Sequence, residues 1–187
     1  MNPPSFSLIL VMVLTATFAC RCCAGPSNYY LRHACRATLY PSLCIRTLCP
    51  NSHTRSSRGV ARAAISVCLA KAKDASSYIS SLAQGKTMKR IEVAALSDCR
   101  ENFDDVLDLL HRSLRVLRKL SAVDFELQMS NVQTWVSAAL TNEDTCLDGF
   151  RGVSSTIWPP LSSTVTNVEH LTSNALALVN RLASGGP

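Results

Sequence analysis

The residues in this 187-residue sequence that could most readily do chemistry are three carboxylates. Glu101, Asp105 and Asp108 stand at positions i, i+4 and i+7 of CRENFDDVLDLL, a spacing that places them on one face of a helix. Acid–base catalysis by such a row would need a cleft, which the surface of a helix does not supply. Carboxylates early in a helix also interact favourably with the helix dipole, and this structural role is favoured on the residues alone.

Other catalytic and ligand-binding patterns are missing. The sequence has no G-x-S-x-G elbow, no H-E-x-x-H motif, no phosphate-binding glycine loop and no dinucleotide fingerprint. The histidines fall in separate segments without a partner at ligand spacing, so we interpret them as surface residues: His33, His53, His111 and His170. We therefore expect no enzyme activity, no bound metal and no cofactor.

The N-terminal region is typical of a secretory signal. Residues 6–19 form an uncharged apolar run, too short to cross a bilayer of about 30 Å as a helix. No Lys or Arg precedes the run, which departs from the usual pattern. The polar residues after Ala24 favour cleavage there, giving a signal peptide over 1–24. The run has no second copy downstream, so we expect a secreted protein without a membrane anchor.

Cleavage after Ala24 leaves six of the nine cysteines in a chain bound for an oxidising compartment, where disulfides are the default. Six cysteines allow 15 pairings, so spacing alone does not settle the connectivity. Cys35 and Cys44 flank Tyr40-Pro41 and could lock a short hairpin. Cys99 and Cys146 lie on the inward faces of two expected helices and could join them.

The two remaining cysteines lie outside these candidate pairs. Cys68 lies on an inward helical face, where we interpret it as a small packing residue. Cys49 follows the expected hairpin next to Pro50. It could be exposed, could pair with Cys68, or could link two molecules.

The elements that must position these residues are helices. Few glycines and prolines, with abundant Ala, Leu and Ser, favour an all-α chain. Four segments have apolar residues at helical spacing: one from Ala61 to Leu82, one over about 88–120, one from a capping box at Ser130 to a stop at Gly152, and one after Pro159-Pro160. They predict a disulfide-stabilised up-down-up-down four-helix bundle over 57–187, preceded by an N-terminal helical hairpin and connection over 25–56.

Three stretches resemble the plant invertase/pectin methylesterase inhibitor family: ACRATLYPSLCIRTL, ALSDCRENFDDVLDLL and TWVSAALTNEDTCLDGF, the last from Thr134 to Phe150. The resemblance spans nearly all of the mature chain. It implies the same architecture, with one inhibitor domain over 25–187, and it implies disulfides joining Cys35 to Cys44 and Cys99 to Cys146. Cys49 and Cys68 lie outside this four-cysteine pattern.

The family has two branches, which inhibit pectin methylesterases or acid invertases. Invertase inhibitors typically carry a Pro-Lys-Phe loop near the third bundle helix, whereas this sequence reads SAVDFELQMSNVQ there. The esterase branch is therefore favoured, with inhibition of a cell-wall or vacuolar acid invertase as the alternative. In the esterase branch the resemblance implies a reversible 1:1 complex that blocks the pectin-binding cleft and modulates cell-wall pectin methylesterification, with the hairpin outside the contact.

The resemblance also changes the interpretation of the acidic row. It implies that five residues face the enzyme: Glu101, Asp105, Asp108, Thr145 and Asp148. The expected localisation is secreted, in the apoplast or cell wall. The net charge of +6 comes from scattered basic residues with few aromatics, so we expect no nucleic acid partner and no membrane partner, but weak association with anionic pectin.

Two other classes of protein fit the sequence less well. Lipid-carrying plant proteins resemble an eight-cysteine pattern with adjacent Cys-Cys pairs in the mature chain, whereas here such pairs occur only in the expected signal. Pectin methylesterases carry a similar domain ahead of their catalytic one, but the sequence stops at Pro187. We therefore expect a free-standing inhibitor. No N-x-S/T sequon is present, so N-glycosylation is not expected.

Overall fold

The structure is a computed structural model that describes residues 29–51, 55–84, 88–153 and 155–185. The predicted signal peptide over 1–24 and its cleavage after Ala24 lie outside these residues. In the described ranges the chain is helical and contains no strand, which confirms the all-α prediction.

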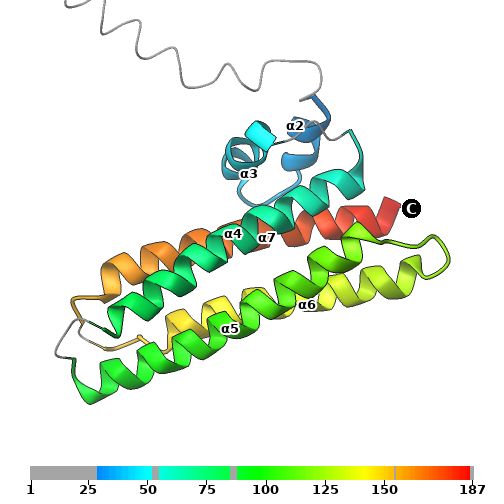
Figure 1. The fold of residues 1–187 in the computed structure, drawn as a ribbon. Helices are drawn as coiled ribbons and strands as arrows, with labels where there is room; N and C mark the ends of the chain where they lie inside the picture. The colour runs from blue at the N-terminus through cyan, green and yellow to red at the C-terminus, as the bar shows by residue number, and fades with distance from the viewer. Residues whose placement is uncertain (1–28, 52–54, 85–87, 154, 186–187) are drawn as a thin grey trace, which may run out of the picture.

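Four long helices form the body of the protein. They are α4 (Ser57–Leu82), α5 (Arg90–Arg118), α6 (Phe125–Asp148) and α7 (Trp158–Gly185). Each packs against two neighbours, so that α4, α5, α6 and α7 close a ring around one core (Figure 1). Successive helices run in opposite directions, as the expected up-down-up-down bundle requires. Within the described ranges, none of these helices has a stretch apolar and long enough to span a bilayer.

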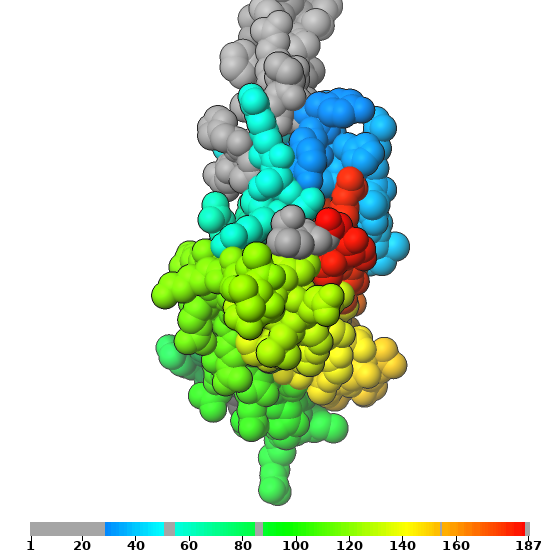
Figure 2. Space-filling model, turned by 90° about the vertical axis from the view of Figure 1, so that its right-hand side faces the viewer, coloured from blue at the N-terminus to red at the C-terminus, as the bar shows by residue number. Residues whose placement is uncertain are grey.

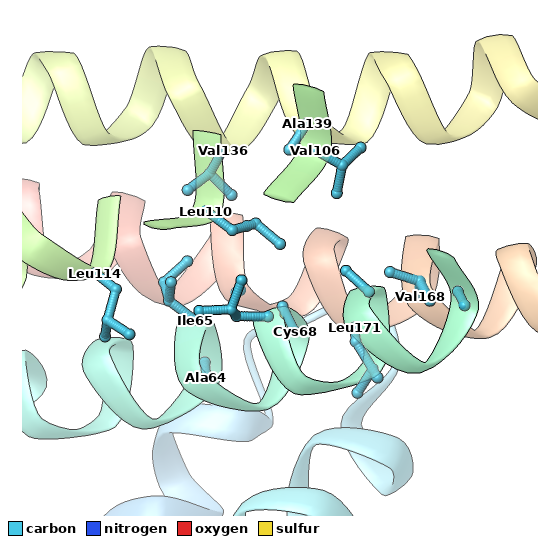
Figure 3. Close-up of a cluster of buried hydrophobic side chains, with 14 of the residues drawn as sticks. Ala64, Ile65, Cys68, Val106, Leu110, Leu114, Val136, Ala139, Val168 and Leu171 are labelled. Atoms are coloured by element: carbon cyan, nitrogen blue, oxygen red, sulfur yellow. The ribbon is translucent and has the colours of Figure 1, made fainter. Parts of the chain in front are cut away.

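The core is built from the inward face of every bundle helix. Figure 3 shows the central layer, in which small and branched apolar side chains from the four helices meet. All of the labelled residues are buried: Ala64, Ile65, Cys68, Val106, Leu110, Leu114, Val136, Ala139, Val168 and Leu171. The apolar spacing in the sequence therefore identified the interior correctly.

A short helical hairpin covers one side of the bundle. It consists of α2 (Tyr29–Cys35) and α3 (Pro41–Leu48), followed by the 3-10 turn η3 (Cys49–Asn51). Both helices pack on α4 and α7, so the hairpin lies on the side of the bundle opposite to α5 and α6 (Figure 1). The outer surface of the α5–α6 pair is left uncovered by the hairpin.

The turn of the hairpin is fastened to α7. The backbone N–H of Tyr40 donates a hydrogen bond to Asn174 Oδ1 (2.9 Å), and Asn174 Nδ2 donates one back to the carbonyl oxygen of Tyr40 (3.0 Å). The Tyr40 ring also stacks on His170, with 3.8 Å between the ring centroids. This paired contact gives a short hairpin a fixed position on the bundle.

Both implied disulfides are present. Cys35 pairs with Cys44 inside the hairpin, and Cys99 pairs with Cys146 between α5 and α6. Cys68 is a buried free cysteine, as expected for a packing residue. Cys49 is only 6% exposed and is itself disulfide-bonded. The low exposure of Cys49 shows that the exposed alternative is wrong, and the free Cys68 shows that the Cys49–Cys68 pair is wrong.

The predicted start of the third bundle helix is also wrong. Ser130, expected as a cap, lies inside α6, which begins at Phe125 after Asp124. The physical reason is burial, because Phe125 and Met129 are 6% and 1% exposed and continue the apolar seam one turn further back. The energy of burying these two side chains outweighs a local capping preference.

The other helix ends differ by smaller amounts. α6 ends at Asp148 with Gly149 as its C-cap, whereas the glycine with the positive φ of 76° is Gly152 in the following turn. α7 begins at Trp158, so Pro159 and Pro160 lie in its first turn rather than ahead of it. Proline is tolerated there because the first backbone N–H groups of a helix have no partner within the helix.

Candidate functional site: the outer face of α5 and α6

The disulfide between Cys99 and Cys146 sets how α5 and α6 lie against each other. The two helices are antiparallel, so each turn beyond Cys99 on α5 lies beside a turn before Cys146 on α6. Residues 101–108 of α5 therefore run alongside the part of α6 that precedes the disulfide. This places the predicted acidic row beside about residues 137–144 of α6, which include the TNED part of the motif, whereas Asp148 lies beyond the disulfide, level with residues that precede Cys99.

The structure brings the three predicted carboxylates together on the outside of α5. Glu101, Asp105 and Asp108 are exposed, as expected from their spacing. Asp108 forms an ion pair with Arg112, which lies one turn later on α5, with 2.8 Å between the oxygen and the nitrogen. Glu101 and Asp105 form no ion pair with any residue that the structure describes. Two carboxylates on this face are thus available to a partner.

The two predicted residues of α6 have different positions. Thr145 is exposed next to Cys146, and its hydroxyl donates a hydrogen bond to the carbonyl oxygen of Thr141 (2.8 Å). Asp148 is exposed but lies two residues beyond Cys146, roughly 200° around the helix. It forms an ion pair with Arg151 at 2.8 Å. Thr145 therefore sits beside the disulfide, whereas Asp148 lies further around α6.

The sequence analysis missed two polar residues of this face. Asp98 and Asn102 precede Asp105 at the spacing i, i+4, i+7, and Asn102 Nδ2 donates a hydrogen bond to the carbonyl oxygen of Asp98 (2.8 Å). Asp98 is exposed and Asn102 is half-buried. Both residues could have been predicted from the helical spacing of the acidic row, extended by one turn toward the start of α5.

A further acid lies inside the bundle. Glu143 of α6 is fully buried, with 0% exposure. Its Oε1 accepts a hydrogen bond from the hydroxyl of Thr172 on α7 (2.8 Å), whereas its Oε2 has no hydrogen-bond partner among the described residues. Burial raises the pKa of Glu143 to about 8, and the nearby charge of Glu169 acts in the same direction. Glu143 is thus a neutral carboxylic acid in acidic and neutral solution.

The environment of Glu143 also affects the free cysteine. Burial raises the pKa of the Cys68 thiol on α4, and the charge of Glu143 raises it further. A thiol with a raised pKa is a poor nucleophile. Cys68 and Glu143 therefore do not form a reactive pair.

The sequence contained a signal for the buried acid that we did not use. Glu143 falls at the core spacing between Ala139 and Cys146, four residues after the first and three before the second. The correct prediction would have been one acid on the inward face of α6, with its charge removed by protonation.

The described part of the surface is suited to binding a partner rather than to catalysis. None of its groups of His, Cys, Asp and Glu is arranged to hold a metal ion, within the ranges that the structure describes. The exposed carboxylates of α5 lie on a convex helix surface, where water has full access. What the α5–α6 face can do is present polar and negatively charged groups on a rigid helix pair.

Comparison with known proteins identifies the family. Residues 29–178 match the family described as plant invertase/pectin methylesterase inhibitor. Pectinesterase inhibitor 3 of Arabidopsis thaliana is 43% identical over 80% of this chain and 77% of its own length. The 21 kDa protein of Daucus carota is 37% identical over 96% of this chain and 93% of its own length. Against pectinesterase inhibitor 10 of Arabidopsis thaliana, at 41% identity, the chain spans about half of the relative's length (51%).

A solved structure shares the fold. The crystal structure of mutant form A of a pectin methylesterase inhibitor from Arabidopsis superimposes with a TM-score of 0.65, covering 79% of this chain and 93% of that one at 23% identity. The four-helix body, the hairpin and the family match are in agreement. This chain belongs to the plant invertase/pectin methylesterase inhibitor family.

Proposed function

We propose that this chain is a secreted protein inhibitor of pectin methylesterase. It binds the enzyme reversibly, one molecule to one, and thereby modulates pectin methylesterification in the cell wall. It is an inhibitor and not an enzyme, as the relatives named pectinesterase inhibitors indicate for the family. The observation that carries the assignment of the binding face is the uncovered α5–α6 surface with its unpaired carboxylates.

Three properties suit this surface to an enzyme cleft. The disulfide between α5 and α6 holds the two helices in one register, so little conformational freedom is lost on binding. The hairpin packs on α4 and α7 and leaves the opposite side open. The exposed carboxylates can pair with cationic or polar groups, which gives orientation and specificity.

Inhibition then follows from exclusion of substrate. A rigid pair of helices that fills the pectin-binding cleft keeps the polysaccharide away from the catalytic groups, and no reaction of the inhibitor is needed. The assigned contacts are Glu101, Asp105, Asp108, Thr145 and Asp148. Among these, Asp108 and Asp148 must exchange their ion pairs with Arg112 and Arg151 for contacts with the enzyme.

A link between this fold and the esterase also occurs in other chains. Pectinesterase 2 of Arabidopsis thaliana is 30% identical to this chain over 85% of its residues, which correspond to 28% of that protein. A segment of this kind is thus found in a protein named as the esterase itself. This supports an esterase, rather than an invertase, as the target.

The test is inhibition of two enzymes side by side. The oxidised protein, residues 25–187, is titrated against a plant pectin methylesterase and a plant acid invertase near pH 5 to 6. We expect loss of methylesterase activity to a 1:1 end point, with invertase activity unchanged. Loss of invertase activity alone would assign the protein to the other branch of its family, and no effect on either enzyme would contradict the proposed function.

A further inference from the structure

A strip of exposed basic side chains lies at the end of the bundle where α4 begins and α5 ends. Arg115, Arg118 and Lys119 of α5 are exposed and form no ion pair with any residue in the described ranges. With His111 and Leu114 they line a shallow depression of about 430 Å³. Figure 2 shows this end of the molecule, where the start of α4 in cyan adjoins the end of α5 in light green.

The carbonyl oxygens at the end of α5 are satisfied by Arg58 of α4, so the basic side chains of the strip are not needed to cap this helix. Its guanidinium donates hydrogen bonds to three carbonyl oxygens at the end of α5, those of Leu117 (3.0 Å), Arg118 (2.9 Å) and Leu120 (3.4 Å). Basic side chains near the end of a helix often satisfy these carbonyls themselves. Here Arg58 does so, and the side chains of Arg115, Arg118 and Lys119 are left free for a ligand.

The same contact adds an arginine from α4 to the strip. Arg62 lies one turn after Arg58 and is exposed, so it shares the side of α4 that faces α5. Because the two helices are antiparallel, Arg62 lies level with the turn of α5 that precedes the last one. The basic strip, which we define as Arg62, Arg115, Arg118 and Lys119, thus spans both helices.

The strip adjoins the face assigned to the enzyme along α5. Arg112, which is paired with Asp108, lies between the acidic row and Arg115, and Arg115 follows Asp108 by seven residues on the same face of α5. The acidic residues that follow at this end, Asp124 and Glu126, belong to the start of α6 rather than to the α4 side of α5. Arg118 and Lys119 lie about one further turn along α5, beyond Arg115.

We infer that the basic strip binds a polysaccharide with free carboxylate groups, the product of the enzyme that this protein is proposed to inhibit. Hydrolysis of a pectin methyl ester replaces a neutral ester by a carboxylate, so the product is a linear polyanion whereas the highly esterified substrate is not. Positive charges about one helical turn apart match repeated carboxylates on such a chain. The inference rests on the proposed function, and it adds retention of the inhibitor where de-esterification has advanced.

The test is direct binding without any esterase, so it does not depend on inhibition. The oxidised chain is titrated with de-esterified polygalacturonate and with highly methyl-esterified pectin at low salt. We expect at least tenfold tighter binding to polygalacturonate, lost progressively as salt is added. Equal binding to the two polymers would overturn the inference. So would stronger competition by double-stranded DNA than by polygalacturonate at equal charge concentration, which would mark the strip as a general polyanion surface.

A pair of charge-matched variants locates the site. The variant R115Q/R118Q/K119Q removes three charges from the strip, and R36Q/R46Q/R90Q removes three exposed charges from the hairpin and the far end of α5. We expect at least a tenfold loss of polygalacturonate binding in the first variant and less than a threefold loss in the second, with unchanged helix content in both. Equal losses would overturn the strip as the site and leave net charge as the cause.

Discussion

Carboxyl groups lie on both faces of the α5–α6 pair, exposed on the outer face and buried on the inner face. On the outer face, Glu101 and Asp105 are exposed and form no ion pair within the described residues. On the inner face, Glu143 is completely buried, with one oxygen bonded to Thr172 and the other without a partner. The outer carboxylates are therefore open to a partner, whereas the inner carboxyl is kept neutral by its surroundings.

This difference separates recognition from stability. Removal of an exposed carboxylate costs the fold little, because water solvates it in both the folded and the unfolded state. The ionisation of a buried carboxyl is costly, because no cation compensates its charge. The account therefore predicts that changes on the inner face act on unfolding, and that changes on the outer face act on binding.

The largest effect is expected from the disulfide that holds the two faces in register. Replacement of Cys99 and Cys146 by Ala opens a closed loop with a sequence separation of 47 residues, which on the chain-entropy model lowers the free energy of unfolding by about 4 kcal/mol. The same change at Cys35 and Cys44, with a separation of 9, should cost about 2.5 kcal/mol. Urea unfolding measures both, and equal losses would contradict loop length as the cause.

The next effect concerns Glu143 and pH. Its pKa is about 8 in the folded protein against an ordinary value of 4.5, so the folded state holds a proton that the unfolded state releases between these values. The contribution of Glu143 to stability is therefore greatest below pH 4.5 and falls as pH rises toward 8, by about 3 kcal/mol from pH 5 to 8.

The substitution Glu143→Gln removes this titration while it keeps the size of the side chain. We expect the variant to lose most of the decline in unfolding free energy between pH 5 and 8, as measured by urea titrations at several pH values. Asp144→Asn, at the exposed neighbour, is the control and should retain the decline. The same pH profile in wild type and Glu143→Gln would show that Glu143 does not control it.

A smaller effect is expected on the opposite side of the bundle, at the hairpin. Asn174→Ala removes both hydrogen bonds to the backbone of Tyr40 and should lower the free energy of unfolding by about 2 kcal/mol. Gln133→Ala, which breaks the exposed bond between Gln133 and Asn180, is the control and should cost well under 1 kcal/mol. Because the hairpin lies away from the assigned enzyme face, inhibition should be unchanged, and a loss of inhibition by a folded Asn174→Ala protein would place the hairpin in the contact.

Most of the architecture could be predicted from the sequence because apolar spacing reports burial directly. The seam from Ala61 to Leu82 and the acidic row on α5 were found by their periodicity alone. The start of α6 was not, because a local capping signal at Ser130 competed with burial of Phe125, and tertiary packing prevailed. Glu143 was not predicted as a core residue, because acidic side chains are rarely buried completely.

The disulfide pairings could not be predicted from the spacing of residues along single helices. Inward spacing made Cys99 and Cys146 plausible partners, but it placed Cys68 inward as well. The family resemblance implied the Cys99–Cys146 pair, and the relative placement of α5 and α6 confirms it. Asp148 belongs to the motif in sequence but lies a half turn away from Cys146 on α6.

Contact between the outer face of α5 and α6 and the esterase is tested by titrating a pectin methylesterase with two charge-matched variants. E101A/D105A/D108A should inhibit at least tenfold less tightly than the wild type, a loss of about 1.4 kcal/mol, with helix content and unfolding free energy retained. D74A/D124A/E126A removes three exposed carboxylates elsewhere and should inhibit like the wild type. Unchanged potency of the first variant, or equal losses in the two, would contradict the account.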